Sequence, residues 1–376
     1  MKKSYQYVLL IFALLYLSSS VAQGSDQAVA QQEALEKAVA KTLITYQMPG
    51  LSVVVVDKAK ILGLAAKGKR KQTAEGKLTV TDRMHLGSNT KAMTGFLAAQ
   101  LVAEGKIKWE TKVLDLFPNW KTNTKPAYQN ITLQELLSHR AQIQPFTAGI
   151  DFMIIPPAEG TIVERRKKFA AWVLTLEPVK IDPTTGYTYS NAGYAIASTM
   201  LEAVTGEAWE DLLKTYLFAP LKIEAGYDWP AMKDQDQPWG HLDGAPHDPN
   251  SEYHLDALVA AAGAVNMSTQ DYAKFLQLQL KGLAGEDDLL PAKTVQFLHT
   301  ANAAAGRYGI GWGRTTIDAI PVHYHDGSAG TFYCHSLIFT EAGIAFAILT
   351  NAADQKTVEG VYDLSKQLRG IFLTTK

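Results

Sequence analysis

One serine and one lysine in the first third of the sequence have the types and the spacing needed for nucleophilic catalysis. Ser88 stands three residues before Lys91 in the stretch HLGSNTKAMTGF. Serine is a weak nucleophile at neutral pH unless a neighbouring base takes its proton, and residues three apart lie on one face of a helix. A serine at a helix start also lies near free amide groups, which favour negative charge in a transition state. The spacing therefore permits an activated serine.

The same serine has a simpler interpretation as the N-cap of a helix, a position that serine favours. The spacing alone arises about once or twice by chance in a chain of this length. Two later stretches of the sequence contain motifs that can act together with Ser88. Tyr189-Ser190-Asn191 lies in GYTYSNAGYAIA, about one hundred residues after Ser88, and His325-Asp326-Gly327 lies in YHDGSAGTF, at an expected strand. Three ordered motifs favour the catalytic interpretation.

With these motifs the sequence resembles the serine β-lactamase-like family, which includes class C β-lactamases, D-alanyl-D-alanine peptidases and related esterases. Its members carry S-x-x-K, Y-x-N and K-T-G or H-x-G in this order. The resemblance extends to LLSHRAQI, SNAGYAIASTMLEAVTG, AAAGAVNMSTQDYAKFLQ and YGIGWG, and it covers nearly everything after residue 30. It implies an α+β fold (an α/β sandwich), in which helices flank an antiparallel sheet. An inserted all-helical domain would complete the fold, with the site in the seam.

The resemblance also implies a role for each motif residue. Ser88 would attack the substrate carbonyl and form an acyl-enzyme, while Lys91 and Tyr189 share the proton transfers and Tyr189 passes a proton to the leaving group. Asn191 would hold Lys91 or the substrate by hydrogen bonds. The backbone N–H groups of Ser88 and Ser328 would form the oxyanion hole. The other residues implied around the substrate are His325 and Gly327. Which of Lys91 and Tyr189 is the general base stays open.

The proposed proton network predicts a pH dependence. Tyrosine has an ordinary pKa near 10 and becomes a useful base only if a nearby cation stabilises the phenolate. Lys91 is the proposed source of that charge, and His325 would add to it when protonated. We therefore expect activity to rise from mildly acidic to mildly alkaline pH.

The third motif departs from the family pattern at Asp326, where relatives that act on β-lactams commonly have a threonine or serine that helps to hold the substrate carboxylate. A second carboxylate at that place weakens binding. We therefore expect slow or no β-lactam hydrolysis. The expected function is an exported serine hydrolase that acts as an esterase on short acyl esters or amides. The alternatives are a D-amino-acid peptidase or D,D-carboxypeptidase, a weak β-lactamase, and a catalytically silent binding module of the same fold.

Several other residues attract attention but have plain structural interpretations. Tyr128-Gln129-Asn130 is a second Y-x-N, but it lies only about forty residues after Ser88 and runs directly into an expected helix. His139 is interpreted as a loop hydrogen-bonder. Trp312 is interpreted as a strand aromatic near the cleft, with direct substrate contact as the alternative. Cys334 is the only cysteine, and we expect it to be a buried, unreactive side chain.

The elements that must position these residues follow from hydrophobic periodicity. A β-hairpin is expected within residues 51–68, and 229–249 is expected to be an irregular surface segment. The expected helices are 31–46, 90–104, 132–139, 161–174, 192–205, 209–217, 269–282 and 358–371. The later expected strands are 308–317, 322–327, 331–340 and 344–351. The predicted domains are a sheet domain of residues 23–84 plus 256–376 and a helical domain of residues 85–255.

Composition limits the classes of partner. The chain has 376 residues, of which 47% are hydrophobic, and a formal net charge of −1, so neither nucleic acid nor an acidic membrane surface is an expected partner. We expect a small-molecule or peptide substrate. The sequence contains no recognisable phosphate-binding loop, dinucleotide fingerprint or metal-ligand spacing, so no cofactor and no metal are expected. The oligomeric state is left open.

The first residues are typical of a signal peptide. Lys2 and Lys3 precede the apolar stretch YVLLIFALLYL, and Ser20-Val21-Ala22 places small residues where a signal peptidase reads them. We expect residues 1–22 to be removed after Ala22, a periplasmic or secreted protein, and no membrane span in the mature chain.

Overall fold

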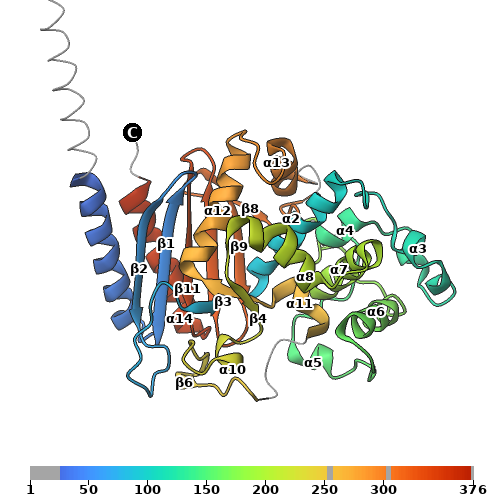
Figure 1. The fold of residues 1–376 in the computed structure, drawn as a ribbon, viewed down its shortest axis with the longest axis horizontal. Coiled ribbons are helices and arrows are strands. Elements are labelled where there is room, and N and C mark those ends of the chain that lie inside the picture. The colour runs from blue at the N-terminus through green and yellow to red at the C-terminus, as the bar shows by residue number, and fades with distance from the viewer. Residues whose placement is uncertain (1–25, 252–256, 302–305, 374–376) are drawn as a thin grey trace, which may run out of the picture.

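The computed structural model describes residues 26–251, 257–301 and 306–373. Its centre is a six-stranded antiparallel sheet in the order β2-β1-β11-β10-β9-β8. Two strands come from the start of the chain and four from its end (Figure 1). The strands are β1 (Gly50–Asp57), β2 (Ile61–Gly68), β8 (Gly313–Ile317), β9 (Ile320–Ser328), β10 (Tyr333–Phe339) and β11 (Ile344–Thr350). The expected antiparallel sheet, built from both ends of the sequence, is thus present.

Strand β1 shows why the sheet needs a cover on both faces. Its run of four valines is fully buried, and side chains alternate between the faces of a strand. Val54 and Val56 enter one core cluster, while Val53 and Val55 enter the other. The sheet therefore separates two hydrophobic cores, and each core requires its own layer of helices.

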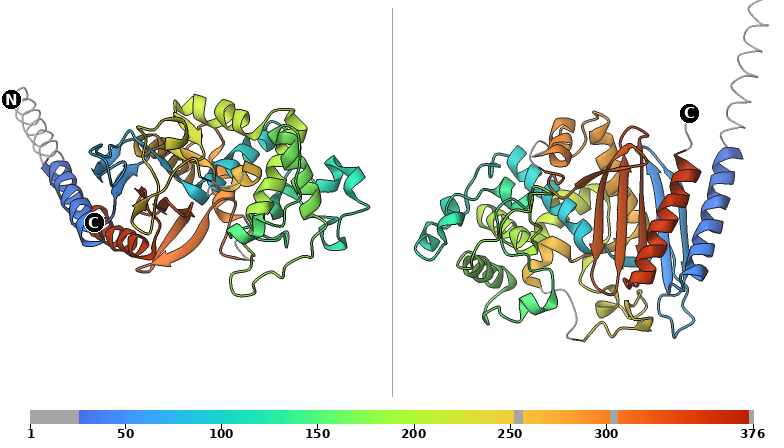
Figure 2. Two further views of the ribbon diagram at one scale, coloured as in Figure 1. Left: turned by 90° about the horizontal axis from the view of Figure 1, so that it is seen from below. Right: turned by 180° about the vertical axis from the view of Figure 1, so that it is seen from behind.

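The outer face is covered by the helix of residues 26–45 and by α14 (Gln355–Phe372), which come from the two ends of the chain (Figure 2). Leu35 of the first helix and Leu368 of α14 pack in the cluster that holds Val53. Asp354 begins α14 as its N-cap, since its carboxylate accepts the Thr357 amide at 3.0 Å.

The inner face carries α12 (Thr269–Leu283) and the helical lobe. The main helices of the lobe are α2 (Thr90–Ala103), α4 (Leu133–Leu137), α6 (Ile162–Val173), α7 (Asn191–Thr205) and α8 (Trp209–Leu213). The remaining numbered helices are α3 (Val113–Leu116), α5 (Gly149–Phe152), α9 (Ala219–Leu221), α10 (Pro230–Lys233), α11 (Ala260–Gly263) and α13 (Ala292–Thr300). Two small sheets join β3 (Arg83–His85), β7 (Val265–Ser268) and β4 (Ala225–Tyr227), and β5 (His241–Leu242) with β6 (Ala245–Pro246).

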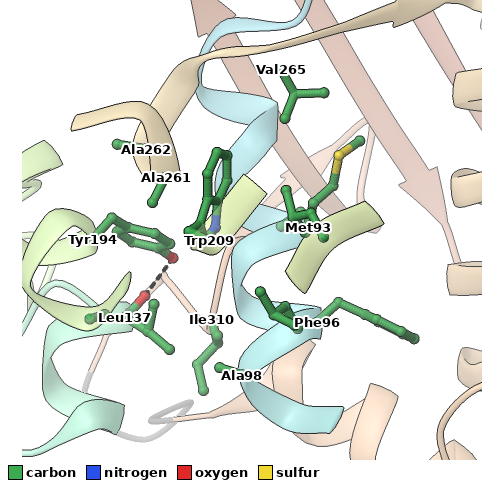
Figure 3. Packing of buried hydrophobic residues seen from close by; sticks show 14 of the residues in the cluster. Met93, Phe96, Ala98, Leu137, Tyr194, Trp209, Ala261, Ala262, Val265 and Ile310 are labelled. Carbon is green, nitrogen blue, oxygen red and sulfur yellow. Dashed lines mark hydrogen bonds between the residues drawn. The ribbon is translucent and has the colours of Figure 1, made fainter. Parts of the chain in front are cut away.

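Helix α2 is buried along nearly its whole length. Figure 3 shows its Met93 and Phe96 near side chains from other elements, among them Trp209 of α8 and Ile310. Trp209 Nε1 donates to Thr94 Oγ1 at 3.2 Å. A helix that is apolar on all sides belongs in a core, so the element that carries Lys91 is held rigidly from every direction.

Two segments differ from the expectations. Residues 308–312 were expected to begin a strand, but β8 begins only at Gly313. Gly311 has φ of +76°, and an added Cβ would lie 2.4 Å from Ala92 Cα, so this segment bends closely against α2. Helix α13 was not expected, although its buried Ala292, Val295 and Leu298 follow helical spacing.

Within the described parts of the chain, no helix is both long enough and apolar enough to span a bilayer. The expected signal peptide, residues 1–22, lies outside the described residues.

Candidate functional site

Ser88 lies in a 3-10 turn, Gly87–Asn89, that leads directly into α2. The turn is held by the buried side chain of Asn89, whose Nδ2 donates to the carbonyls of Leu86 at 3.2 Å and Cys334 at 3.1 Å. Its Oδ1 accepts from the Tyr272 hydroxyl at 2.9 Å. The N-cap of α2 is Asn89, so the interpretation of Ser88 as the helix cap is wrong.

Lys91 is fully buried, and its amine contacts three oxygens. Nζ lies 3.1 Å from Ser88 Oγ, 2.7 Å from Asn191 Oδ1 and 2.8 Å from the carbonyl oxygen of Ala262. The two carbonyl oxygens are acceptors only. They therefore fix two N–H directions of the amine, and the third position faces the serine hydroxyl.

The Tyr189-Ser190-Asn191 motif stands at the start of α7 and is fastened to the loop of residues 139–146. Ser190 caps α7 by accepting the Gly193 amide at 2.9 Å, and it donates to the Gln144 carbonyl at 2.7 Å. Asn191 Nδ2 donates to the Phe146 carbonyl at 2.8 Å, which leaves its Oδ1 for Lys91. Loop and helix together thus orient the amide.

Tyr189 lies over Lys91, with Nζ 4.5 Å from the centre of the phenol ring. Its ring centre is 4.3 Å from that of His139 and 6.4 Å from that of His325. Burial is the main cause that raises the pKa of Tyr189 above its ordinary value, and a hydrogen bond with Ser88 opposes this rise. The phenol therefore keeps its proton and can donate it.

Burial has the opposite effect on the amine. It holds the pKa of Lys91 well below its ordinary value, because a charged ammonium loses its hydration in the interior. Burial thus shifts the amine toward its neutral form and the phenol toward its protonated form, which opposes the expected stabilisation of a Tyr189 phenolate by Lys91.

His325 has both ring nitrogens occupied. Nδ1 lies 2.8 Å from the Asp326 carbonyl oxygen, and Nε2 lies 2.9 Å from the Tyr308 hydroxyl. A carbonyl only accepts, so Nδ1 carries the proton and Nε2 accepts from Tyr308. Burial is the main cause that lowers the pKa of His325 to about 4. His325 is therefore neutral at pH 7 and adds no positive charge to the site.

Strand β9 brings Gly327 against the turn that holds Ser88. A Cβ added to Gly327 would lie 2.0 Å from the Leu86 carbonyl oxygen and 2.9 Å from the Ser88 nitrogen. A Cβ added to Gly87 would lie 2.8 Å from the Ser328 nitrogen. The absence of side chains at both glycines lets the two amides that could form an oxyanion hole approach each other.

Asp326 points the other way. Its Oδ1 accepts from His335 Nδ1 at 2.6 Å and from the Tyr333 hydroxyl at 3.0 Å, and its Oδ2 accepts from the hydroxyl of Tyr362, in α14, at 3.2 Å. The expectation that this carboxylate opposes a substrate carboxylate in front of Ser88 is therefore corrected. Successive residues of a strand face opposite sides, and His325 takes the cleft side.

The other singled-out residues have structural roles. Trp312 is fully buried and stacks on His299 with ring centres 4.8 Å apart, so direct substrate contact is excluded. Tyr128 is buried and donates to the Gln142 carbonyl at 3.1 Å, while Asn130 accepts from the half-buried Lys112. Cys334 is buried, and burial raises its pKa.

Sequence reasoning missed the aromatic surroundings of the motifs. Tyr308 touches His325, and its ring centre lies 5.3 Å from that of Tyr187. His139, expected to be a loop hydrogen-bonder, accepts the Ser190 amide at 3.1 Å and also packs on Tyr189. The only sequence signal was the placement of Tyr187 and Tyr308 inside the two stretches GYTYS and YGIGWG.

The chain is similar to several known hydrolases and penicillin-binding proteins. Penicillin-binding protein 4 of Amycolatopsis lactamdurans is 27% identical over 322 residues, which is 81% of this chain and 81% of that protein. The unguisins hydrolase ungD' of Aspergillus campestris (strain IBT 28561) is 27% identical over 342 residues, 84% of this chain and 60% of that protein. The N-acetylmuramyl-L-alanine amidase of Bacillus subtilis (strain 168) is 23% identical over 344 residues, 81% of this chain and 77% of that protein.

Solved structures share the fold. SurE aligns with a TM-score of 0.72 at 21% identity over 91% of this chain and 76% of that one. The octameric penicillin-binding protein homologue from Pyrococcus abyssi aligns with a TM-score of 0.67 at 20% identity over 89% of this chain and 76% of that one. The model of the family described as Beta-lactamase matches residues 27–366. Since this match spans most of the sequence, the chain belongs to the Beta-lactamase family, a family of serine hydrolases with this fold.

Proposed function

We propose that the protein is an exported serine hydrolase that forms an acyl-enzyme on Ser88 and acts as an esterase on short acyl esters or amides. The observation that carries the proposal is the environment of the Lys91 amine. A neutral amine has two N–H groups and one lone pair. Asn191 Oδ1 and the Ala262 carbonyl take the two N–H groups, and the lone pair is left for the Ser88 proton.

In this mechanism Lys91 is the general base for acylation. It accepts the hydroxyl proton as Ser88 Oγ attacks the substrate carbonyl, and the developing oxyanion accepts from the amides of Ser88 and Ser328. Tyr189 gives its proton to the leaving group and recovers one from Lys91. Water then attacks the acyl-enzyme carbonyl and releases the acid, with the same groups moving the protons in reverse order.

Amide hydrolysis is the second candidate. Relatives that match most of this chain are called a penicillin-binding protein, an unguisins hydrolase and an N-acetylmuramyl-L-alanine amidase. Because the motifs also resemble those of D-alanyl-D-alanine peptidases, peptides that contain D-amino acids are the amide substrates to test first. Because the Asp326 carboxylate is engaged by His335, Tyr333 and Tyr362, it no longer gives a reason against β-lactams. Nitrocefin belongs in the same panel.

The test is a panel of p-nitrophenyl esters, D-amino-acid anilides and nitrocefin, measured with the wild type, Ser88→Ala and Ser251→Ala. Ser251 is the matched control because its Oγ lies 2.7 Å from His247 Nε2, the arrangement of an alternative serine–histidine pair. We expect Ser88→Ala alone to lose turnover, and a fluorophosphonate adduct to map to Ser88. Adduct on Ser251, or equal turnover in all three proteins, contradicts the proposal. Absence of both turnover and adduct in the wild type favours the silent binding module.

Export rests on residues 1–22 of the sequence. We expect the protein expressed from its full sequence in a bacterium to begin at residue 23 outside the cytoplasm. N-terminal sequencing of the periplasmic or secreted fraction tests this, and an intact Met1 in that fraction contradicts it.

A further inference from the structure

A small pocket beside Tyr189 is not used by the proposed chemistry. It has a volume of about 140 Å³. Its walls are four tyrosines, a glycine, a histidine and an aspartate: Tyr187, Tyr189, Tyr308, Tyr324, Gly313, His325 and Asp326. The pocket lies at the edge of the sheet, where β8 begins with Gly313 opposite Tyr324.

The rings enclose the pocket from different directions. The ring of Tyr308 is nearly perpendicular to that of Tyr189, at 88° with centres 6.4 Å apart, and lies 5.3 Å from that of Tyr187. On the opposite wall, a Cβ added to Gly313 would lie 2.7 Å from Cε1 and 2.8 Å from Cζ of Tyr324. The absence of a side chain at Gly313 thus lets the Tyr324 ring approach the backbone there.

The position of the pocket indicates which part of the substrate it would hold. Tyr189 and His325 line it, whereas Ser88, Lys91 and Asn191 do not. Tyr189 is the group that we propose gives its proton to the leaving group. A leaving group that receives this proton therefore has its remaining atoms on the side of the four tyrosines.

Size and charge narrow the class of ligand. An apolar cavity of about 150 Å³ holds benzene, so the pocket fits one six-membered ring. Two opposite charges border it. Burial is the main cause that raises the pKa of both Tyr187 and Tyr324. The nearby charge of Asp326 adds to the rise at Tyr324, and that of the exposed Arg307 opposes it at both tyrosines. Arg307 disfavours a cation among these rings, Asp326 disfavours an anion, and the tyrosine rings favour an aromatic partner.

We propose that this pocket binds an uncharged aromatic ring of the leaving group, so that the preferred substrates are esters or amides of benzyl-type alcohols and amines. The inference rests on the proposed function and deepens it. In the acylation step the bond from the carbonyl carbon to the leaving oxygen or nitrogen breaks and the bond to Ser88 Oγ forms. The ring departs as the neutral alcohol or amine after protonation by Tyr189.

The test compares acetate esters of ethanol, benzyl alcohol, cyclohexylmethanol and choline, because ethyl, benzyl and cyclohexylmethyl esters have leaving groups of similar basicity. We expect kcat/KM for the benzyl ester to exceed that for the ethyl ester by about 10-fold or more. Tyr324→Leu and Gly313→Ala should each lower this ratio several-fold while the ethyl ester is turned over as before. Tyr216→Leu, a half-buried tyrosine elsewhere in the lobe, should keep the ratio.

The outcomes separate the inference from the function on which it rests. Ser88-dependent turnover with equal preference for benzyl and cyclohexylmethyl esters, or with preference for choline ester, overturns the inference alone. So does an unchanged ratio in Gly313→Ala and Tyr324→Leu. Absence of Ser88-dependent turnover of every ester overturns the proposed esterase. In that case, binding of benzyl alcohol to Ser88→Ala, measured by ligand-observed NMR, still tests the pocket: it should exceed binding of cyclohexylmethanol and weaken in Gly313→Ala.

Discussion

The amine of Lys91 and the amide oxygen of Asn191 lie 2.7 Å apart, although one hundred residues separate them in the chain. This contact joins the helix behind the nucleophile to the first residue of α7. Because Asn191 offers an uncharged acceptor, it orients the amine without supplying the negative charge that would keep it protonated. The contact thus has an electrostatic consequence as well as a geometric one.

Replacing Asn191 by aspartate tests that consequence. Asn191→Asp keeps the size of the side chain but adds an anion beside Lys91, which raises the pKa of the amine. We expect lower activity at neutral pH and recovery at alkaline pH, seen as an upward shift of the acidic limb of kcat/KM. Asn191→Ala is the comparison variant, and it should lose activity at every pH without this shift. If Asn191→Asp does not regain activity at alkaline pH, or if its acidic limb is not shifted, the result contradicts Lys91 as the base.

The wild-type pH profile should have a rising acidic limb. Only the neutral amine accepts a proton, so kcat/KM increases as pH rises through the pKa of Lys91, which burial holds well below its ordinary value. His325, with its pKa of about 4, is not the source of this limb. The limb should therefore persist in His325→Asn. A flat profile from about pH 5 to about pH 9 would count against the proton network.

Tyr189→Phe should affect substrates unequally. The substitution keeps the ring over Lys91 but removes the hydroxyl that we propose protonates the leaving group. A p-nitrophenolate leaves without a proton, whereas an alkoxide or an amine needs one, so kcat should fall about 10²-fold for alkyl esters and amides and much less for p-nitrophenyl esters. Single-turnover assays with matched acetyl substrates measure the ratio. An equal loss for both leaving groups would show that Tyr189 acts elsewhere in the cycle.

Gly327→Ala should damage the oxyanion site. The new methyl group would meet the Leu86 carbonyl at 2.0 Å, so β9 must move away from the turn that carries Ser88. We expect kcat/KM to fall by about 10²- to 10³-fold, the usual loss when one oxyanion donor is misplaced. Gly370→Ala, where nothing lies within 4 Å of the added atom, is the control. Circular dichroism checks that both variants fold, and full activity in Gly327→Ala would contradict the assignment.

A buried charge cluster in the lobe predicts a pH dependence of stability. Arg166 Nη2 lies 3.3 Å from Glu202 and 2.7 Å from Glu210, yet burial is the dominant effect and raises the pKa of Glu202 to about 7. The folded state therefore binds a proton that the unfolded state releases near pH 4.5. This contribution to the free energy of unfolding is fully present below about pH 4.5 and is lost as pH rises through 7.

Glu202→Gln should abolish the loss of stability that Glu202 causes as pH rises through 7. We expect the variant to be more stable than the wild type at pH 8, by roughly 1 to 3 kcal/mol, with little difference near pH 5. Urea unfolding at both pH values measures it, with the exposed Glu207→Gln as control. A variant that is less stable than the wild type at pH 8 would show that the ion pair with Arg166 outweighs the cost of burial.

The sequence determined the local geometry of the site. Helical spacing predicted that Ser88 and Lys91 lie close together. Two β-rich runs around a short turn predicted the β1–β2 hairpin. The order of the motifs along the chain identified Tyr189 and His325 as candidates. Local periodicity needs no knowledge of distant residues, and for this reason the β1–β2 hairpin and most long helices were predicted to within a few residues.

Tertiary packing decided the rest. The period of two along β9 already separated His325 from Asp326, but only the packing of α14 shows that the Asp326 side faces Tyr362 and not the substrate. The bend at Gly311 exists because that segment presses against α2, and the protonation of Lys91 and Tyr189 depends on burial by residues far away in sequence. Spacing along a chain fixes which neighbours a side chain has on its own element. Desolvation and the choice between the two faces of a strand depend on what packs against that element.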